Sequence, residues 1–560
     1  MPARFFWRLG GQASILLWAC LGVIFGPSRV EADNQRVIIE KPQGPVEARL
    51  PCNRAASPYC DLRLYQVMVS SFVDGNGAVG AGSAYGPGPH SGDLAGVIQS
   101  LDMIQAMGFN AIWLTPIFES HAGEPQLRVS GKKVVNQRLD GTGYYPRDYF
   151  RIDPQFGSEA DVRTLVDQAH QRGIKIIFDG VFGHHKGGIT PSPTGIVPAT
   201  SNRVSDYFGH PENYPGQVVD FDQPQSLAFY EEVARYWIER FGIDGWRLDQ
   251  AYQLPNPALA RLSQIVEEAA SVRPKSGYVV GEIWRKADDI RAAYGTSEAP
   301  GLTSAFDFPT RYALVQVLAS DEAGTKNRPA RTLVEPWALG AHSNYPDHAI
   351  PNLMLGNHDL VRFGDLIERA GKGGQEADSY WARHRLAFTF MAAWSGPITF
   401  YYGEELGAEV PGFSGRTGQN CGKSQTCDDH IARNMVKLPP VNAKESEVLP
   451  KALALRSYLT ELLTLRKVSP ALSSGARTHL FSDQDVYADL KSLGNEKYVL
   501  IMNVSDHARR IRLTREAVDL ANLRGSRLLI GDVGVQSSAG SIEIDLPPLS
   551  TGIIQLQAVH

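Results

Sequence analysis

Short apolar runs alternate with amphipathic stretches between residue 62 and about residue 402, and this alternation restricts the fold more than any other feature. Eight of the runs have the length and composition of buried strands. The expected strands are Leu64–Ser70, Ala111–Thr115, Ile174–Phe178, Gly245–Leu248, Tyr278–Glu282, Ala305–Phe308, Asn352–Leu355 and Ile398–Tyr402. The expected helices include Asp93–Met107, Glu159–Arg172, Gln225–Phe241, Ala258–Val272 and Tyr380–Trp394. This order predicts an α/β fold, a (β/α)8 TIM barrel.

The barrel is expected to span residues 58–470, with a small insertion after its third strand at about 185–216. Residues 33–57 are polar and irregular, and they predict an N-terminal linker or strap. Residues 471–560 show two-residue alternation with almost no helical signal. This last segment predicts a C-terminal all-β sandwich domain.

The first residues have the pattern of an export signal. Basic residues precede the apolar run Ile15–Phe25, which is shorter than the roughly 20 residues that a membrane helix needs. Val30 to Ala32 form a small-residue cleavage pattern. The sequence therefore predicts a signal peptide over residues 1–32, a secreted or periplasmic protein, and no membrane span after signal removal. A membrane anchor is the alternative interpretation.

The cysteines are in keeping with an oxidising compartment. After removal of the signal, Cys52, Cys60, Cys421 and Cys427 remain, and four cysteines allow three pairings. The two local pairs are the natural choice, because each closes one loop and neither has the C-x-x-C spacing of a zinc site. The net charge of −5 comes without a basic patch, so the sequence predicts no nucleic-acid partner.

Polar side chains end four of the expected strands, and strand ends of a barrel meet at one mouth. These strand ends read FDGVFGHH, DGWRLDQ, VGEIW and LGNHDLVR. Together they supply Asp179, His184, Arg247, Asp249, Glu282, His358, Asp359 and Arg362. One such residue alone is more often a cap or an ion-pair partner, whereas their coincidence at one mouth indicates an active site.

Two carboxyl groups with opposite tasks are what glycoside hydrolysis requires. Arg247 lies on the same strand face as Asp249 and can orient that carboxylate and hold it ionised. Apolar neighbours follow Glu282, and burial would raise its pKa as a general acid needs. A catalytic transition metal is the rival interpretation, but no H-x-H or HExxH spacing is present.

From about Tyr65 to Arg433 these segments resemble the α-amylase superfamily, glycoside hydrolase family thirteen, whose members are retaining α-glucosidases and α-glucosyltransferases. The resemblance is carried by YQVMVSSFVDGNG, GYYPRDYF, FDGVFGHH, GIDGWRLD, VGEIW, GNHDLVR and ITFYYGEELG in this order. It implies that Asp249 is the nucleophile, Glu282 the acid/base and Asp359 the transition-state stabiliser. The substrate-binding residues that it implies are Tyr144, beneath the sugar, with His184, Arg247, His358 and Arg362.

The resemblance also implies a substrate class. The enzyme would hydrolyse α-glucosidic bonds in malto-oligosaccharides or related α-glucans, as an oligosaccharide or polysaccharide substrate, through a covalent glycosyl-enzyme and without an organic cofactor. A transglucosylase or isomerase that uses the same intermediate is the alternative. A non-catalytic carbohydrate-binding relative is a third interpretation, although such relatives lose the carboxylates that this chain keeps.

The sequence departs from the family pattern beside the expected nucleophile. Gly183 stands where a calcium-binding Asn is expected, and Tyr252 and Gln253 replace a Lys-His pair. These changes weaken the usual calcium site and put starch endo-cleavage in doubt.

A second family calcium site is better preserved. Asp74, Asn76 and Asp93 resemble the first-loop site of cyclodextrin glycosyltransferases, and their oxygen ligands suit Ca²⁺. A glycine-rich turn that is capped by Asp and Asn is the alternative interpretation.

Overall fold

The computed structural model describes residues 36–77, 90–120, 127–129, 132–134, 142–185, 187–204, 217–410, 431–519, 523–538 and 540–558. The predicted signal peptide over 1–32 and the cysteines Cys421 and Cys427 lie outside these residues. No helix in the described part of the chain is long and apolar enough to cross a membrane.

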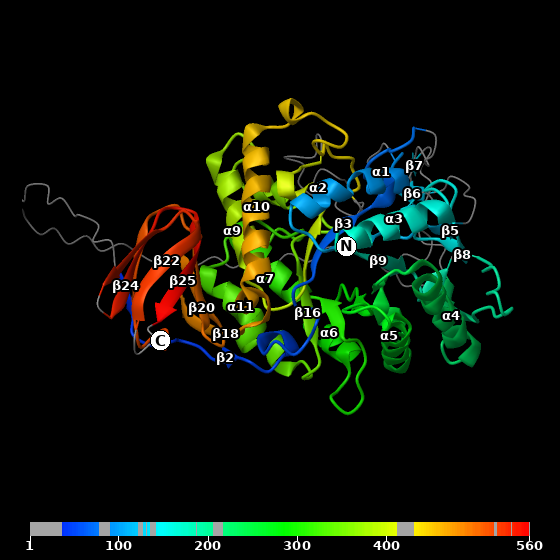
Figure 1. Cartoon of the computed structure of the whole chain (residues 1–560), viewed down its shortest axis with the longest axis horizontal. Coiled ribbons are helices and arrows are strands. Elements are labelled where there is room, and N and C mark those ends of the chain that lie inside the picture. Colours follow the sequence, from blue (N-terminus) through cyan, green and yellow to red (C-terminus); the bar gives the residue numbers. More distant parts are fainter. Residues whose placement is uncertain are drawn as a thin grey trace, which may run out of the picture. The chain divides into compact units, whose positions relative to one another are not determined.

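Eight parallel strands close into a barrel, as the alternation predicts (Figure 1). They are β3 (Arg63–Val67), β4 (Ala111–Leu114), β9 (Lys175–Gly180), β13 (Gly245–Leu248), β14 (Tyr278–Gly281), β15 (Ser304–Phe306), β16 (Ile350–Met354) and β17 (Ile398–Tyr401). Strand β17 pairs with β3 and closes the ring. The strands are almost wholly buried, because helices cover the outside of the sheet and side chains fill its inside. The (β/α)8 fold is therefore confirmed.

The helices follow the strands in the expected order. They are α1 (Leu94–Gln99), α2 (Leu101–Ala106), α3 (Glu159–Gln171), α4 (Pro224–Phe241), α5 (Asn256–Ala270), α6 (Ala287–Tyr294), α7 (Phe308–Leu318), α8 (Phe363–Arg369), α9 (Asp378–Ala392), α10 (Pro450–Val468) and α11 (Pro470–Ser474). The single helix expected over 93–107 is divided at Ser100, whose hydroxyl donates back to the carbonyl of Gly96. Helix α3 begins with a capping box between Ser158 and Asp161.

In the described residues, two segments between barrel strands form small sheets of their own. The insertion expected after the third strand forms a small sheet of β10 (His184–His185), β11 (Thr200–Val204) and β12 (Gln217–Val219). A second excursion, between β4 and β9, was not expected from the sequence. It contains β5 (Phe118–Ser120) paired with β8 (Pro146–Ile152), and the hairpin of β6 (Leu127–Val129) and β7 (Lys132–Val134).

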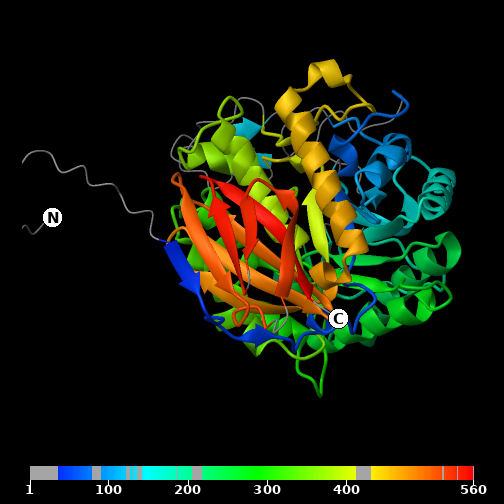
Figure 2. The same ribbon diagram turned by 60° about the vertical axis from the view of Figure 1, so that its left-hand side comes forward.

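The C-terminal segment folds into β-sheets, and the N-terminal strap joins them (Figure 2). The strands are β18 (Ala476–Ser482), β19 (Val486–Leu493), β20 (Glu496–Asn503), β21 (Arg509–Thr514), β22 (Leu523–Gly531), β23 (Gly534–Ser538), β24 (Ser541–Leu546) and β25 (Ser550–Ala558). Strand β1 (Arg36–Ile39) pairs in parallel with β21, and β2 (Val46–Glu47) pairs with β18. Apolar side chains from both sheets share one core.

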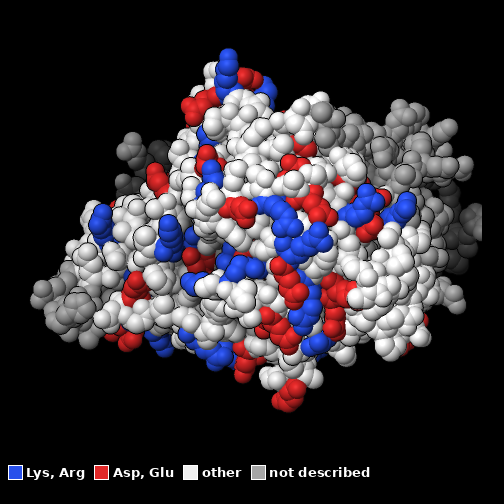
Figure 3. All heavy atoms as spheres, turned by 45° about the vertical axis from the view of Figure 1, so that its right-hand side comes forward, with Lys and Arg blue, Asp and Glu red and all other residues white. Residues whose placement is uncertain are grey.

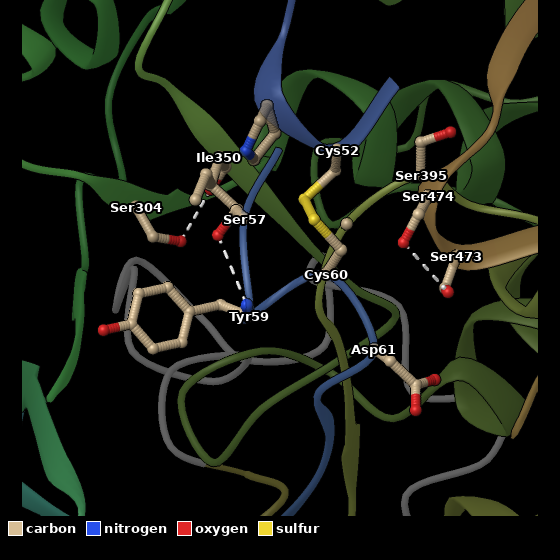
Figure 4. Close-up of a disulfide and its surroundings, with 12 residues drawn as sticks. Cys52, Ser57, Tyr59, Cys60, Asp61, Ser304, Ile350, Ser395, Ser473 and Ser474 are labelled. Atoms are coloured by element: carbon tan, nitrogen blue, oxygen red, sulfur yellow. Dashed lines mark hydrogen bonds between the residues drawn. A yellow bond between two sulfur atoms is a disulfide. The ribbon is translucent and has the colours of Figure 1, made fainter. Parts of the chain in front are cut away.

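A disulfide closes a short loop before strand β3. Cys52 and Cys60 are bonded with their Cα atoms 5.4 Å apart, as one of the two local pairs predicts (Figure 4). On the face in Figure 3, basic and acidic side chains lie intermixed rather than in areas of one sign.

Candidate active site

Arg247 holds three carboxylates together at the mouth of the barrel. Its strand, β13, lies between β9 and β14, and its backbone is opposite Asp179 in the register. Its Nη1 lies 2.7 Å from Asp179 Oδ1 and 2.8 Å from Asp249 Oδ1. Its Nη2 lies 2.7 Å from Glu282 Oε2. Asp249 and Glu282, which are predicted as a catalytic pair, thus share one guanidinium.

This cluster is buried, and burial determines its protonation. Burial raises the pKa of Glu282 to about 8, with nearby Asp249 and Asp359 acting in the same direction and Arg247 opposing them. Burial also raises the pKa of Asp179 to about 7, again against the opposing charge of Arg247. A pKa of about 8 leaves most of Glu282 protonated at neutral pH, so this carboxyl group can donate a proton.

The predicted sugar-binding residues surround the same cluster. The Tyr144 ring lies parallel to the His358 ring, with 5.1 Å between centroids and an interplanar angle of 8°. The Tyr144 hydroxyl donates to Asp179 Oδ2 at 2.9 Å. His184 Nε2 lies 4.0 Å from Asp249 Oδ2. The structure therefore brings Tyr144, His184 and His358 into one site with the carboxylates.

Arg433 belongs to this site, although sequence reasoning did not assign it a role. Its Nη2 donates to Asp359 Oδ1 at 2.6 Å, and its Nε donates to the carbonyl of His358 at 3.3 Å. It comes from the segment after residues 411–430, far along the chain from β16. No local pattern around Arg433 indicates this contact, because only the folded chain brings the two segments together.

Arg362, a predicted substrate-binding residue, donates hydrogen bonds from its guanidinium nitrogens to other residues of the chain. Nε donates to the Asn434 side chain at 2.8 Å, and Nη1 and Nη2 donate to the carbonyls of Tyr402 and Ala432 at 2.9 and 3.1 Å. These bonds hold the segment that carries Arg433. The substrate-binding role of Arg362 stays a prediction.

Replacing Arg433 by leucine is expected to lower kcat on maltotriose by about 10- to 100-fold, because Asp359 would lose the contact that fixes its carboxylate. Arg433→Lys should recover only part of this loss, since lysine cannot make both contacts of the guanidinium. Steady-state kinetics and thermal melts check this. An unchanged kcat in Arg433→Leu would contradict the role.

The predicted calcium residues lie in a different part of the barrel. Asp93 caps helix α1, and its Oδ1 accepts from the backbone N–H groups of Gly75 and Gly96 at 3.0 and 2.7 Å. Its Oδ2 is buried and has no hydrogen-bond partner among the described residues. Asp74 Oδ1 accepts from Gly77 N at 2.7 Å. Within the described part, no group of three His, Cys, Asp or Glu residues is arranged to hold a metal.

Comparison with known proteins places the whole site in one family. Residues 66–226 and 201–440 match the family model "Alpha amylase, catalytic domain". The chain belongs to the α-amylase family. It is therefore a glycosidase by family, and the barrel with its carboxylate cluster is the family's catalytic domain.

Several relatives of this α-amylase family member are known. A cyclomaltodextrinase of Geobacillus thermopakistaniensis (strain MAS1) is 27% identical over 520 residues, which cover 87% of this chain and 76% of the relative. Two further cyclomaltodextrinases are matched over 60% and 51% of their lengths. An intracellular maltogenic amylase of Bacillus subtilis is 29% identical over 333 residues, which cover 57% of this chain and 49% of the relative. A variant of AmyP, whose crystal structure contains maltotriose, is 40% identical with a TM-score of 0.79, and the match covers 90% of this chain and 98% of that chain.

Proposed function

We propose that this chain is a retaining glycoside hydrolase that cleaves α-glucosidic bonds in malto-oligosaccharides or related α-glucans. The observation that carries the proposal is the contact of Asp249 and Glu282 with the same buried guanidinium of Arg247. Retaining enzymes hold their two carboxyl groups about 5 Å apart, and a shared guanidinium is compatible with such a separation. AmyP, with 40% identity, was crystallised with maltotriose and with maltose, which supports the substrate class.

In the first step, the carboxylate of Asp249 attacks the anomeric carbon and forms an ester bond to the sugar. The glycosidic C–O bond breaks, and protonated Glu282 donates its proton to the leaving oxygen. The raised pKa of Glu282 keeps this proton available at neutral pH. Arg247 keeps Asp249 oriented through its contact at 2.8 Å.

In the second step, Glu282 is a carboxylate and takes a proton from a water molecule. The oxygen of that water attacks the anomeric carbon, the ester bond to Asp249 breaks, and both residues return to their first state. A sugar hydroxyl in place of water would give transglycosylation, the alternative that the same residues allow. Asp359 and His358, whose Oδ2 and Nε2 atoms lie 3.3 Å apart, would hold the hydroxyls of the reacting sugar.

The test is the configuration and identity of the products. The protein is incubated with maltotriose, starch, isomaltose, trehalose, sucrose and cyclic glucans, and the first product is followed by ¹H NMR. Release of the α-anomer first is the expected result. Release of the β-anomer first would contradict retention, and no turnover of any α-glucan would contradict the function. Longer or rearranged products would favour the transfer alternative.

We also propose a structural Ca²⁺ held by Asp74, Asn76 and Asp93. Support comes from the buried Oδ2 of Asp93, which has no hydrogen-bond partner among the described residues, and from the hard oxygen donors of the loop. Burial raises the pKa of Asp93, and the positive charge of a bound cation would stabilise its ionised carboxylate.

Excess EDTA is expected to lower the melting temperature, and added Ca²⁺ is expected to restore it, because a ligand that binds only the folded state stabilises it. Scanning calorimetry measures the change. Asp93→Asn is the comparison variant, and its melting temperature should not respond to EDTA. An equal response of the two proteins, or no response of the native protein, would contradict the calcium site.

We propose, finally, that the protein is exported and cleaved after Ala32. The basic and apolar pattern of residues 1–32 and the Cys52–Cys60 disulfide support export. The intracellular Bacillus subtilis relative does not support it. Mass measurement of the protein from culture medium or periplasm is the test, and an uncleaved N-terminus in the cytoplasm would contradict it.

A further inference from the structure

Gln253 connects the loops that follow strands β9 and β13. It ends the short 3-10 helix Ala251–Gln253, directly after the loop that carries Asp249. Its side-chain Oε1 lies 2.9 Å from His184 Nδ1, and its Nε2 donates to Gln250 Oε1 at 2.9 Å. One amide group therefore reaches from the histidine beside Asp249 to the residue after Asp249.

Gln250 has a backbone conformation that needs support. Its φ of 40° and ψ of 48° lie in the left-handed region, which a residue with a side chain adopts at an energetic penalty. Its side-chain oxygen accepts from Gln253 and from the Tyr252 hydroxyl, the latter at 2.8 Å. In this conformation its backbone N–H donates to Glu282 Oε2 at 3.2 Å. The side-chain bonds thus hold the N–H group against the expected acid/base.

The position of Gln253 depends on Gly183. A Cβ atom at residue 183 would lie 2.4 Å from Gln253 Oε1 and 2.7 Å from Gln253 Cβ, both closer than non-bonded atoms allow. The glutamine side chain can therefore take this position only because residue 183 lacks a side chain. Tyr252 and Gln253 both donate to Gln250 Oε1, and Gly183 lies against the Gln253 side chain, so these three departures from the family pattern are neighbours.

We propose that Gln253 is a positioning residue of the active site. It fixes His184 beside Asp249, and it fixes the backbone N–H of Gln250 against Glu282. An amide oxygen only accepts hydrogen bonds, so it places a hydrogen on Nδ1 of His184 and fixes the orientation of the ring beside Asp249. This inference rests on the proposed roles of Asp249 and Glu282.

The variant Gln253→Met keeps the length of the side chain and removes its hydrogen bonds with His184 and Gln250. Its kcat on maltotriose is expected to fall by about 10- to 100-fold, with a melting temperature close to that of the native protein. The alkaline limb of its kcat/KM profile should move to higher pH. The hydrogen bond from Gln250 N–H lowers the pKa of Glu282. Loss of that bond therefore raises this pKa, and Glu282 keeps its proton to higher pH.

Among the described residues, the charged groups that act most strongly on Glu282 are Arg247, Asp249 and Asp359, and all of them are retained in this variant. A shift of the alkaline limb therefore reports the bond from Gln250. Native kcat in Gln253→Met, or lower activity with an unmoved alkaline limb, would overturn the proposal. Suppose that the native protein turns over maltotriose and Asp249→Asn does not. Either of the two results for Gln253→Met then rejects the role of Gln253 and leaves the proposed function standing. Inactivity of the native protein on every α-glucan would instead reject the proposed function.

A second pair of variants tests the contact itself. Gly183→Ala should reproduce the lower kcat and the shifted alkaline limb, because the added methyl group displaces Gln253. In the Gln253→Gly background, Gly183→Ala should have little further effect, since the contact is already absent. This non-additivity is the expected result. Equal effects of Gly183→Ala in both backgrounds would overturn the pairing of the two residues.

Discussion

Replacement of Asp249 by asparagine is expected to lower kcat on maltotriose by about 10⁴-fold or more, with no change of fold. The amide is nearly isosteric with the carboxylate and can still accept from Arg247 Nη1, but it cannot form the ester with the sugar. Arg247 also keeps its contacts with Asp179 and Glu282. Steady-state kinetics with a circular dichroism melt measure both parts of this prediction.

Asp244→Asn is a matched control for this variant. Asp244 is also buried, but it precedes strand β13, at the end of the strand away from the mouth, and lies 2.7 Å from His170 Nε2. Its loss should lower the melting temperature and leave kcat nearly unchanged. Near-native kcat in Asp249→Asn would show that the assignment of the nucleophile is wrong. A loss of kcat in Asp244→Asn as large as that in Asp249→Asn would show the same.

Glu282→Gln is expected to lower kcat on maltotriose by about 10²- to 10⁴-fold, because the leaving sugar oxygen would no longer receive a proton. A substrate with a good leaving group, such as α-maltosyl fluoride, needs no such proton, so its first step should be far less affected. In the native protein, kcat/KM on maltotriose should fall as pH rises through about 8, where Glu282 loses its proton.

The sign of this pH dependence follows from the role of Glu282. Burial raises the pKa of the carboxyl group, so the protonated acid persists below about pH 8 and is lost above it. The alkaline limb should be absent in Glu282→Gln, because glutamine does not titrate. An alkaline limb that remains in this variant would assign the titration to another group, and equal losses on the fluoride and on maltotriose would contradict the acid role.

The local pattern of the sequence determined the barrel and the centre of the site. The apolar runs marked all eight strands, because a strand buried on both faces needs a continuous apolar segment. Two-residue alternation placed Arg247 and Asp249 on one strand face, and the contact at 2.8 Å agrees with it. Apolar residues after Glu282 indicated its burial, and Glu282 is 4% exposed.

Contacts between distant segments were decided only by the tertiary structure. Asp359 pairs with Arg433, β1 with β21, and Gln253 fills the space beside Gly183. The second excursion, which carries β5 and β8, also went unpredicted. The periodicity of a segment determines which of its faces is buried, because this depends on neighbours along the chain. It does not determine which remote side chain meets that face, because such a meeting depends on how all the elements pack together.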